Sequence, residues 1–440
     1  MAGSGFADRG VMNSAVQTMK YGIRVNLRQV VLHLLQVLLV GMTLGMMRTV
    51  VPALAETEFG LPRGSFMLLV AFVVAFGFVK GAMNFVAGRL AERLGRKKVL
   101  LLGWLVALPI PVIIYLANSW GWIVFATVLL GVNQGLTWSM TQTAKLDITR
   151  ADQRGLVIGL NEFSGYIGVA LAGIATAYIA SLLGARAGLL WFGGVVVVLA
   201  TLLTWLAVVE TLPWAQSEGK STSNVGAQPR PQISTGEMFA LMSWRDKRMA
   251  ALCQAGLVEK FVDALVWVFW PIYLQQQGVS LQNMAWIVGV YGLTWGGAQL
   301  FTGKLSDRVG RHRLNYLGMW VCGAGVGLMP LGAGAAWWST SAGITGLGMA
   351  MLYPNLSAAV ADIAHPSWRA SAIGIYRFWR DVGYGIGALG LGAAAAWGGH
   401  IESAFWFVAV AMLVSGAVLL VWGEETHPRL NSSKKVVFEN

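Results

Sequence analysis

The sequence predicts an all-α integral membrane protein in which twelve transmembrane helices form two pseudo-symmetric six-helix bundles. Three observations favour this fold class: an apolar composition, a regular series of apolar runs and an internal repeat. Of 440 residues, 56% are hydrophobic and only 12% are charged, whereas soluble domains carry about 25% charged residues. The formal net charge of +12 does not indicate nucleic-acid binding, because the basic residues cluster between apolar runs, as in cytoplasmic loops.

Apolar runs of about 20 residues, the length that crosses a bilayer, define the expected helices. They occupy residues 27–54, 64–88, 98–117, 121–144, 155–183, 187–209, 249–275, 283–302, 314–335, 341–362, 370–397 and 402–423. The polar stretch in the middle is rich in Ser, Gly, Gln and Pro, which is typical of a flexible linker. The expected parts are an N-terminal tail (1–26), a first bundle (27–209), a linker (210–248), a second bundle (249–423) and a C-terminal tail (424–440).

The placement of Lys and Arg predicts how the chain is oriented in the membrane. Basic residues are concentrated at the N-terminus, in the loops after the second, fourth and eighth helices, in the linker and in the C-terminal tail. Loops of this kind stay on the cytoplasmic side, so both termini are expected in the cytoplasm, with the chain in the inner (plasma) membrane. The stretch before the first apolar run has no apolar core followed by a cleavage site, so no cleaved signal peptide is expected.

An internal repeat relates two pairs of segments by the same offset. GRLAERLGRKK begins at Gly88 and GKLSDRVGRHR begins at Gly303, so the offset is 303 − 88 = 215. LDITRADQRGLVIGLNEF begins at Leu146 and ADIAHPSWRASAIGIYRF begins at Ala361, and the offset is again 361 − 146 = 215. One offset shared by two separate pairs indicates a duplicated six-helix unit. Binding sites in such proteins lie near the midplane, between the repeats.

The repeated segment resembles motif A of the major facilitator superfamily, which lies between helices 2 and 3 of those transporters. The first copy here comprises Gly88, Leu90, Glu92, Arg93, Gly95 and Arg96. The second, between helices 8 and 9, comprises Gly303, Asp307, Arg308, Gly310 and Arg311. The resemblance implies a charged latch that contacts the start of helix 11 and stabilises an outward-open state. Glu92 stands where the family usually has Asp, and positive-inside topology alone also accounts for the second copy.

Two stretches depart from the drug:proton antiporter branch of this family. That branch has an Arg in helix 4, where this chain has Gly131 in GVNQG. It also has a Gly-Pro signature in helix 5, where GYIGVALAG (165–173) contains no proline. The resemblance therefore extends to the superfamily and leaves the branch open.

Ionisable residues inside the apolar runs are the candidates for function, because a charge at the bilayer centre costs about 2.5–3.5 kcal/mol on insertion scales. The seventh run contains Glu259, Lys260 and Asp263. The two acids are four residues apart and share a helix face, with the lysine beside Asp263. Two interpretations are open: the cluster binds protons or substrate, or it is an ion-paired lock that holds the helix.

The eleventh run contains a second charged group, formed by Arg377, Arg380 and Asp381. Asp381 follows Arg377 by four residues, so one arginine is expected to be paired within the helix and the other to face a substrate anion or the acids of helix 7. The repeat matches Arg377 to Glu162 of helix 5 (377 − 162 = 215). These opposite charges either pair across the bundle interface or line opposite walls of one cavity.

Three of the remaining intramembrane polar residues have two interpretations. Arg48 of helix 1 either lines the cavity or extends towards the membrane surface. Asn133 and Gln134 of helix 4 either bind substrate or hydrogen-bond between helices. Lys80 and Lys145 lie nearer the helix ends and are expected to extend their ammonium groups into the interface.

Together these features predict a secondary active transporter of a small organic solute that works by alternating access, with protons as the coupling ion. Export by antiport is the favoured interpretation and uptake of an organic anion is the alternative. An alternative of another class is a membrane sensor or lipid-handling protein. The chain has no G-x-x-x-x-G-K-[ST] segment and no His near a buried nucleophile, so neither ATP drive nor enzymatic activity is expected. The expected partners are the substrate, protons and lipid, for a monomer without metal, cofactor or nucleic acid.

Overall fold

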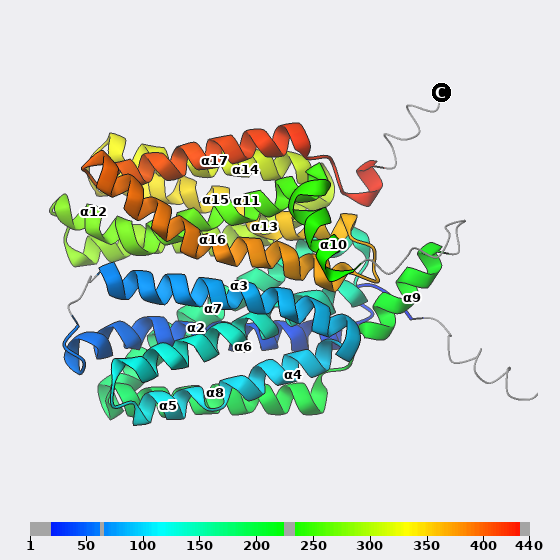
Figure 1. Cartoon of the computed structure of the whole chain (residues 1–440), viewed down its shortest axis with the longest axis horizontal. Coiled ribbons are helices and arrows are strands. Elements are labelled where there is room, and N and C mark those ends of the chain that lie inside the picture. The colour runs from blue at the N-terminus through cyan, green and yellow to red at the C-terminus, as the bar shows by residue number, and fades with distance from the viewer. Residues whose placement is uncertain (1–18, 62–65, 224–233, 432–440) are drawn as a thin grey trace, which may run out of the picture.

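The computed structural model describes residues 19–61, 66–223 and 234–431. The outer parts of both expected tails and the middle of the expected linker lie outside these ranges. Within them, the chain is almost entirely helical, and its long helices run roughly parallel in two layers (Figure 1). The lower layer, drawn in blue through cyan to the green of α8, is the first bundle, and the upper layer, drawn in brighter green to red, is the second.

Each bundle contains six spanning units in the described part of the chain. The first bundle comprises α2 (Leu27–Thr57), α3 (Phe66–Leu94), α4 with α5 (Arg96–Ala107 and Ile110–Leu116), α6 (Trp120–Ile148), α7 (Arg154–Leu183) and α8 (Ala185–Ala207). The second comprises α11 with α12 (Lys247–Ala264 and Trp270–Gln276), α13 (Leu281–Val309), α14 (Arg311–Leu328), α15 (Ala335–Ile363), α16 (Arg369–Gly398) and α17 (Glu402–Trp422).

Short helices complete the chain, most of them in the linker. The linker contains α9 (Leu212–Ser223), α10 (Thr235–Ala240) and the π-helical segment η2 (Leu241–Arg245). The other short segments are η1 (Ala151–Gln153), η3 (Leu265–Phe269) and η4 (Met329–Leu331). Eight segments of the described chain are long and apolar enough to cross a membrane by themselves. Helix α11 is not among these eight, because its charged residues lower its hydropathy.

Three expected helices are interrupted at prolines. The third divides into α4 and α5, with Pro109 at the start of α5. The seventh contains the π-helical segment η3 directly before Pro271 of α12. The ninth ends as an α-helix at Leu328, and Pro330 lies in η4 beyond it. Proline has no N–H and its ring displaces the carbonyl four residues earlier, which disturbs the α-helical hydrogen-bond pattern at these three places, whereas α15 continues through Pro354.

The elements repeat with the offset found in the sequence. Helices α3 and α13 are related by it at their first residues (281 − 66 = 215) and at their last residues (309 − 94 = 215). Helices α6 and α15, and helices α7 and α16, are related in the same way. The two bundles meet through α3 packed on α16 and, by the same symmetry, α13 packed on α7. Because the offset holds for helix bounds and for packing, the chain is two copies of one six-helix unit.

Glycines bring the bundles into backbone contact. A Cβ atom placed on Gly88 of α3 would lie 2.6 Å from the carbonyl oxygen of Ala370 of α16. The equivalent pair is Gly303 of α13 and Gly155 of α7, where the corresponding distance is 2.5 Å. Both distances are far below van der Waals contact, so only glycine permits this approach at either position.

Candidate functional site

The two motif copies lie at one end of the molecule, on the right in Figure 1 and here called the motif end. In the first copy, Glu92 accepts a hydrogen bond of 3.0 Å from the backbone N–H of Ser371, near the start of α16. Glu92 also pairs with Arg89 at 2.9 Å. The expected contact between the motif and helix 11 is therefore present, and the longer Glu side chain makes it.

The second copy makes the equivalent contact in the opposite direction. Asp307 of α13 accepts hydrogen bonds from the backbone N–H groups of Gly155 (3.0 Å) and Leu156 (2.9 Å), at the start of α7. Asp307 is the counterpart of Glu92, since 307 − 92 = 215. Each bundle thus binds the beginning of a helix of the other bundle, which positive-inside topology alone does not require.

The last arginine of each motif is buried and paired inside its own bundle. Nε of Arg96 lies 2.7 Å from Oδ2 of Asp147, and Arg311 pairs in the same way with Asp362. In contrast, Arg93 and Arg308 are exposed. Four motif residues are glycines that the backbone requires. Gly88 and Gly303 lie at the contact described above, and Gly95 and Gly310 have positive φ angles of 94° and 97°. Leu90 packs against the apolar core of the first bundle.

Two acids outside the motifs complete this arrangement. Glu210 accepts a hydrogen bond from the backbone N–H of Arg96 at 2.8 Å. Glu425 accepts one from the N–H of Arg311 at 3.0 Å. Sequence analysis did not single out these acids, although the repeat could have revealed them, since they too are related by its offset (425 − 210 = 215).

A third acid, Glu218 of the linker helix α9, bridges the two bundles at the motif end. Its carboxylate lies 3.2 Å from Nη2 of Arg154 in α7 and 2.9 Å from Nη1 of Arg369 in α16. These arginines are also equivalent (369 − 154 = 215). Burial raises the pKa of Glu218, but the hydrogen bond and charge of Arg369 and the charge of Arg154 outweigh it, so the pKa lies below its usual range. Glu218 is thus a carboxylate shared by two like charges.

A cluster of buried charges lies in the middle of the bundles. Asp263 of α11 accepts hydrogen bonds from Lys260 (2.7 Å), from the hydroxyl of Tyr291 (3.0 Å) and from the hydroxyl of Tyr384 (3.2 Å). All four side chains are buried. The expected pairing of Lys260 with Asp263 is present, and Asp263 is held by three donors.

The charged group on α16 connects the bundles. Asp381 pairs with Arg380 at 3.0 Å. It also accepts a hydrogen bond of 2.6 Å from Asn84 of α3 and lies 3.7 Å from Nζ of Lys80. The arginine paired with Asp381 is thus its neighbour Arg380 rather than Arg377. The expectation for Lys80 is wrong, because its side chain is buried and points to an acid of the other bundle.

Arg377 and Glu162 form an ion pair between the bundles. Nη2 of Arg377 lies 3.0 Å from Oε1 of Glu162 in α7, and Arg377 also donates to the side-chain oxygen of Gln142 in α6. The side chain of Lys145 is buried as well and donates to the carbonyl oxygen of His33, so it does not extend into the interface as expected. Of the two arrangements that the repeat allowed for Glu162 and Arg377, the structure has the direct pair.

Three aromatic residues from both bundles meet beside these charges, and we call them the aromatic cage: Tyr166 of α7, Trp295 of α13 and Tyr353 of α15. The ring centroids of Tyr166 and Trp295 are 4.2 Å apart, and those of Trp295 and Tyr353 are 5.3 Å apart. Nζ of Lys260 lies 4.1 Å from the centroid of the Tyr353 ring and the guanidinium carbon of Arg380 lies 4.9 Å from it. Both distances are within cation–π range. No sequence pattern indicates the cage, since each ring alone resembles ordinary packing.

Some polar atoms in this region lack a hydrogen-bond partner among the described residues. They are Nη1 of Arg380, the hydroxyl of Tyr376 and both carboxyl oxygens of Glu259. All three side chains are almost wholly buried, at 0–1% exposed. Buried polar groups are usually satisfied, so these atoms are the candidates for contact with a ligand or a proton.

The other predicted residues lie around the cluster. The guanidinium of Arg48 sits 3.6 Å from the centroid of the Trp267 ring, and that ring stacks on Tyr384. Asn133 donates to the carbonyl oxygen of Gly103 at 2.9 Å. Gln134 donates to the carbonyl oxygen of Val40 (2.8 Å) and to Thr43 (3.0 Å). Both amides make interhelical hydrogen bonds, so a place for them in the substrate path stays a prediction.

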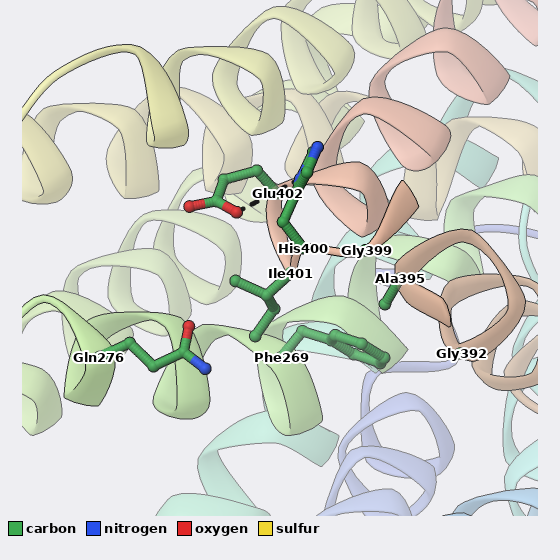
Figure 2. A pocket seen from close by; sticks show the side chains of 8 residues that line it. All are labelled: Phe269, Gln276, Gly392, Ala395, Gly399, His400, Ile401 and Glu402. Carbon is green, nitrogen blue, oxygen red and sulfur yellow. Dashed lines mark ion pairs between the residues drawn. The ribbon is translucent and has the colours of Figure 1, made fainter. Parts of the chain in front are cut away.

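An open cavity lies elsewhere, at the end opposite the motifs. It has a volume of about 530 Å³ and is lined by Phe269, Gln276, Gly392, Ala395, Gly399, His400, Ile401 and Glu402. Figure 2 shows that Glu402 and His400 face each other at its edge, 3.4 Å apart. No group of three or more His, Cys, Asp or Glu that could hold a metal occurs among the described residues. The cavity contains none of the central charges, so the buried cluster is the better candidate site.

The duplicated fold and its paired motifs agree with a family model. The model of the Major Facilitator Superfamily matches residues 34–258 and 252–438, which is nearly the whole chain. The chain belongs to the major facilitator superfamily. Its members are membrane transporters, so this multi-pass chain is a transporter of small solutes rather than an enzyme.

Similar proteins include several transporters. An uncharacterised MFS-type transporter from Salmonella typhimurium is 22% identical over 86% of this chain and 92% of its own length. The 3-(3-hydroxy-phenyl)propionate transporter of Escherichia coli is 28% identical over 43% of this chain and 42% of its own. The probable 4-methylmuconolactone transporter of Cupriavidus pinatubonensis is 25% identical over 83% and 82%.

A solved structure agrees with the fold. The crystal structure of the human organic anion transporter MFSD10 (TETRAN) superposes with a TM-score of 0.72. It covers 89% of this chain and 99% of its own, at 15% sequence identity. At this low sequence identity, the similarity shows a shared fold and nothing about the substrate.

Proposed function

We propose that this chain carries a small organic acid with a planar or aromatic body across the inner membrane, coupled to protons. The observation that carries the proposal is the unpaired Nη1 of Arg380, buried beside the aromatic cage. A guanidinium binds carboxylates through two parallel hydrogen bonds and also stacks on rings. Arg380 and the cage together therefore suit an anion that is apolar and flat at one end.

The balance of charge in the cluster supports an anionic substrate. Four buried basic residues point into it, and three acids pair with them: Lys80, Lys260, Arg377 and Arg380 against Glu162, Asp263 and Asp381. With Glu259 protonated, the basic groups outnumber the acids, and Lys145, which is also buried and near Glu162 and Arg377, adds to the excess when it is protonated. An unbalanced buried charge is costly, and the carboxylate of a bound substrate would neutralise it.

Two of the relatives support the same class of substrate, whereas another is a methyl viologen resistance protein of Salmonella typhimurium. The two supporting relatives are named as transporters of 3-(3-hydroxy-phenyl)propionate and of 4-methylmuconolactone. We place the motif end in the cytoplasm, where the positive-inside rule puts its basic loops and the two chain ends. In that orientation the contacts of Glu92 and Asp307 close the cytoplasmic side, and transport requires that they separate.

Export by antiport, favoured by the sequence, is the second candidate. The specific observation that favours it is Glu259, whose carboxyl has no donor among the described residues and lies close to Arg380 and Tyr376. An ionised Glu259 near aromatic rings would suit a planar organic cation. The two candidates thus differ in which unpaired group meets the substrate.

The test uses purified protein in liposomes with an imposed pH gradient, loaded from either side with radiolabelled 3-phenylpropionate or with ethidium. We expect 3-phenylpropionate to move with protons, and Arg380→Lys to weaken its binding by more than about tenfold, since the buried charge pair is disrupted. Arg150→Lys is the matched control, because the Arg150 side chain is 57% exposed. Movement of ethidium against protons, unaffected by Arg380→Lys, would favour export instead.

A further inference from the structure

One of the buried carboxyl groups differs from the others. Asp263 and Asp381 each pair with a basic side chain, and Glu162 pairs with Arg377. Glu259 is 0% exposed, and neither of its oxygens has a hydrogen-bond partner among the described residues. A carboxylate left ionised and unpaired in a protein interior is strongly disfavoured, so such a group takes up a proton.

The surroundings of Glu259 favour reversible protonation. The ring of Tyr376 lies against Gly256, three residues before Glu259 and on the same face of α11. The Tyr376 hydroxyl is also unpaired among the described residues. Two charged groups of its own helix, Lys260 and Asp263, act on Glu259, and so do Arg380 and Asp381 of α16. Its other titratable neighbours are Tyr376 of α16 and Cys322 of α14. Positive and negative neighbours are thus both present, and changing their balance changes the protonation of Glu259.

We propose that Glu259 is the proton-binding site that couples transport, and that Glu259 and the substrate carboxylate compete for Arg380. The inference rests on the proposed function. When Glu259 is ionised, it attracts the guanidinium of Arg380 and opposes an incoming anion. When Glu259 takes a proton from the outer side, Nη1 of Arg380 is free for the substrate. The proton leaves to the cytoplasm after the substrate has gone.

This proposal divides the helix 7 charges between the two roles that the sequence left open. Asp263 is held by Lys260, Tyr291 and Tyr384, so it is a structural lock. Glu259, four residues earlier, is the group that titrates. Although Glu259 and Asp263 are close in sequence, their roles are separate, because Asp263 remains paired with Lys260 in both protonation states of Glu259.

Protonation is measured first, without any substrate. Infrared difference spectra recorded across a pH titration should show a protonated-carboxyl band in wild type that is missing in Glu259→Gln. Glu402→Gln is the matched control, since Glu402 lies at the opposite end beside His400, and it should keep the band. Glu259→Asp should keep a titrating band at a different pH. A band that persists in Glu259→Gln overturns the proposal.

Coupling is measured next, in liposomes with 3-phenylpropionate as the probe. One proton per anion lets wild type concentrate the probe about tenfold per unit of pH difference. Glu259→Gln should exchange labelled for unlabelled probe but concentrate none, and Glu259→Asp should still concentrate it. Equal accumulation by wild type and Glu259→Gln overturns the proposal. If wild type moves no aryl carboxylate while the band depends on Glu259, the proton site stands and the proposed substrate class fails.

Discussion

Arg377 of α16 and Glu162 of α7 occupy the same position in the two repeats and form an ion pair of 3.0 Å between the bundles. Both side chains are buried, at 0% and 1% exposed. A buried pair with one member removed is destabilising by about 3–5 kcal/mol, because the remaining charge has no partner. Moving the bundles apart would break this pair, so the pair stabilises the arrangement in which the two bundles are in contact at this point.

The first prediction is a charge exchange at this pair. Glu162→Arg and Arg377→Glu should each lower thermal stability and abolish transport, since each leaves two like charges together. The double variant should recover a large part of both, measured as melting temperature in detergent and as initial transport rate. If the double variant is no better than the worse single variant, the two residues do not act through each other.

The second prediction concerns Glu218 and pH. Glu218→Gln removes the anion shared by Arg154 and Arg369. Loss of about 1.5 kcal/mol, the lower end for a hydrogen bond to a charged group, would favour the state open at the motif end about tenfold. Labelling of a cysteine introduced at the motif end reports that state.

The direction of the pH effect follows from the lowered pKa of Glu218. Its contribution is fully present above the ordinary carboxyl pKa and is lost as the pH falls through the lowered value. Labelling of wild type should therefore rise on acidification, and labelling of Glu218→Gln should be high at every pH. Equal labelling of the two proteins at neutral pH would show that the linker carboxylate does not hold this end closed.

The third prediction tests the backbone contact between the bundles. Gly88→Ala and Gly303→Ala place a methyl group 2.6 Å and 2.5 Å from a carbonyl oxygen of the other bundle. Overpacking of this kind costs about 1–3 kcal/mol and should selectively destabilise the state in which the motif end is closed. Gly289→Ala of α13 is the control, because no atom lies within 4 Å of its added Cβ. Similar labelling in all three variants would contradict the prediction.

The fourth prediction separates the aromatic cage from the charges. The hydroxyl of Tyr353 accepts hydrogen bonds from Nζ of Lys260 at 2.9 Å and from the hydroxyl of Tyr166 at 3.0 Å. Tyr353→Phe keeps the ring and loses both hydrogen bonds, whereas Tyr353→Leu loses the ring as well. We expect the Leu variant to weaken binding of 3-phenylpropionate more than the Phe variant does, by about 0.5–1.5 kcal/mol for a lost aromatic contact. Titration calorimetry measures both, and equal affinities would place the substrate away from the cage.

The apolar runs and the repeat predicted the twelve helices. The repeat also identified Arg377 and Glu162 as equivalent positions with opposite charges. A direct pair was one of the two arrangements that it left open. Neither the runs nor the repeat revealed that Lys80 meets Asp381. A helical pattern identifies the face on which a side chain lies, but not the helix that covers that face. The expected second helix ended at residue 88, so Lys80 resembled a residue near a helix end, whereas α3 extends to Leu94 and Lys80 lies at its middle.

The aromatic cage and Glu218 were missed for a related reason. Tyr166, Trp295 and Tyr353 lie on three helices, and nothing in the local sequence of any one of them distinguishes a cage from ordinary packing. Glu218 lies in a polar linker that the composition marked as flexible, and it is ordered by arginines that are distant in sequence. The breaks at Pro109 and Pro271 could have been predicted, because proline interrupts helices by a local mechanism.

The two repeats have diverged unevenly. At the motif end the counterparts are still alike, with Arg96 matching Arg311 and Asp147 matching Asp362. In the middle the same offset joins unlike residues: Lys80 corresponds to Trp295, and Asp381 to Tyr166. Two identical units would have placed the same side chains on both sides of the bundle interface and would not have distinguished the two ends of a ligand. The unlike residues in the middle give the two halves of the buried cluster different side chains, while the matched residues at the motif end keep the same contacts in both repeats. Substitutions in the cluster can therefore change what the molecule carries without changing those contacts.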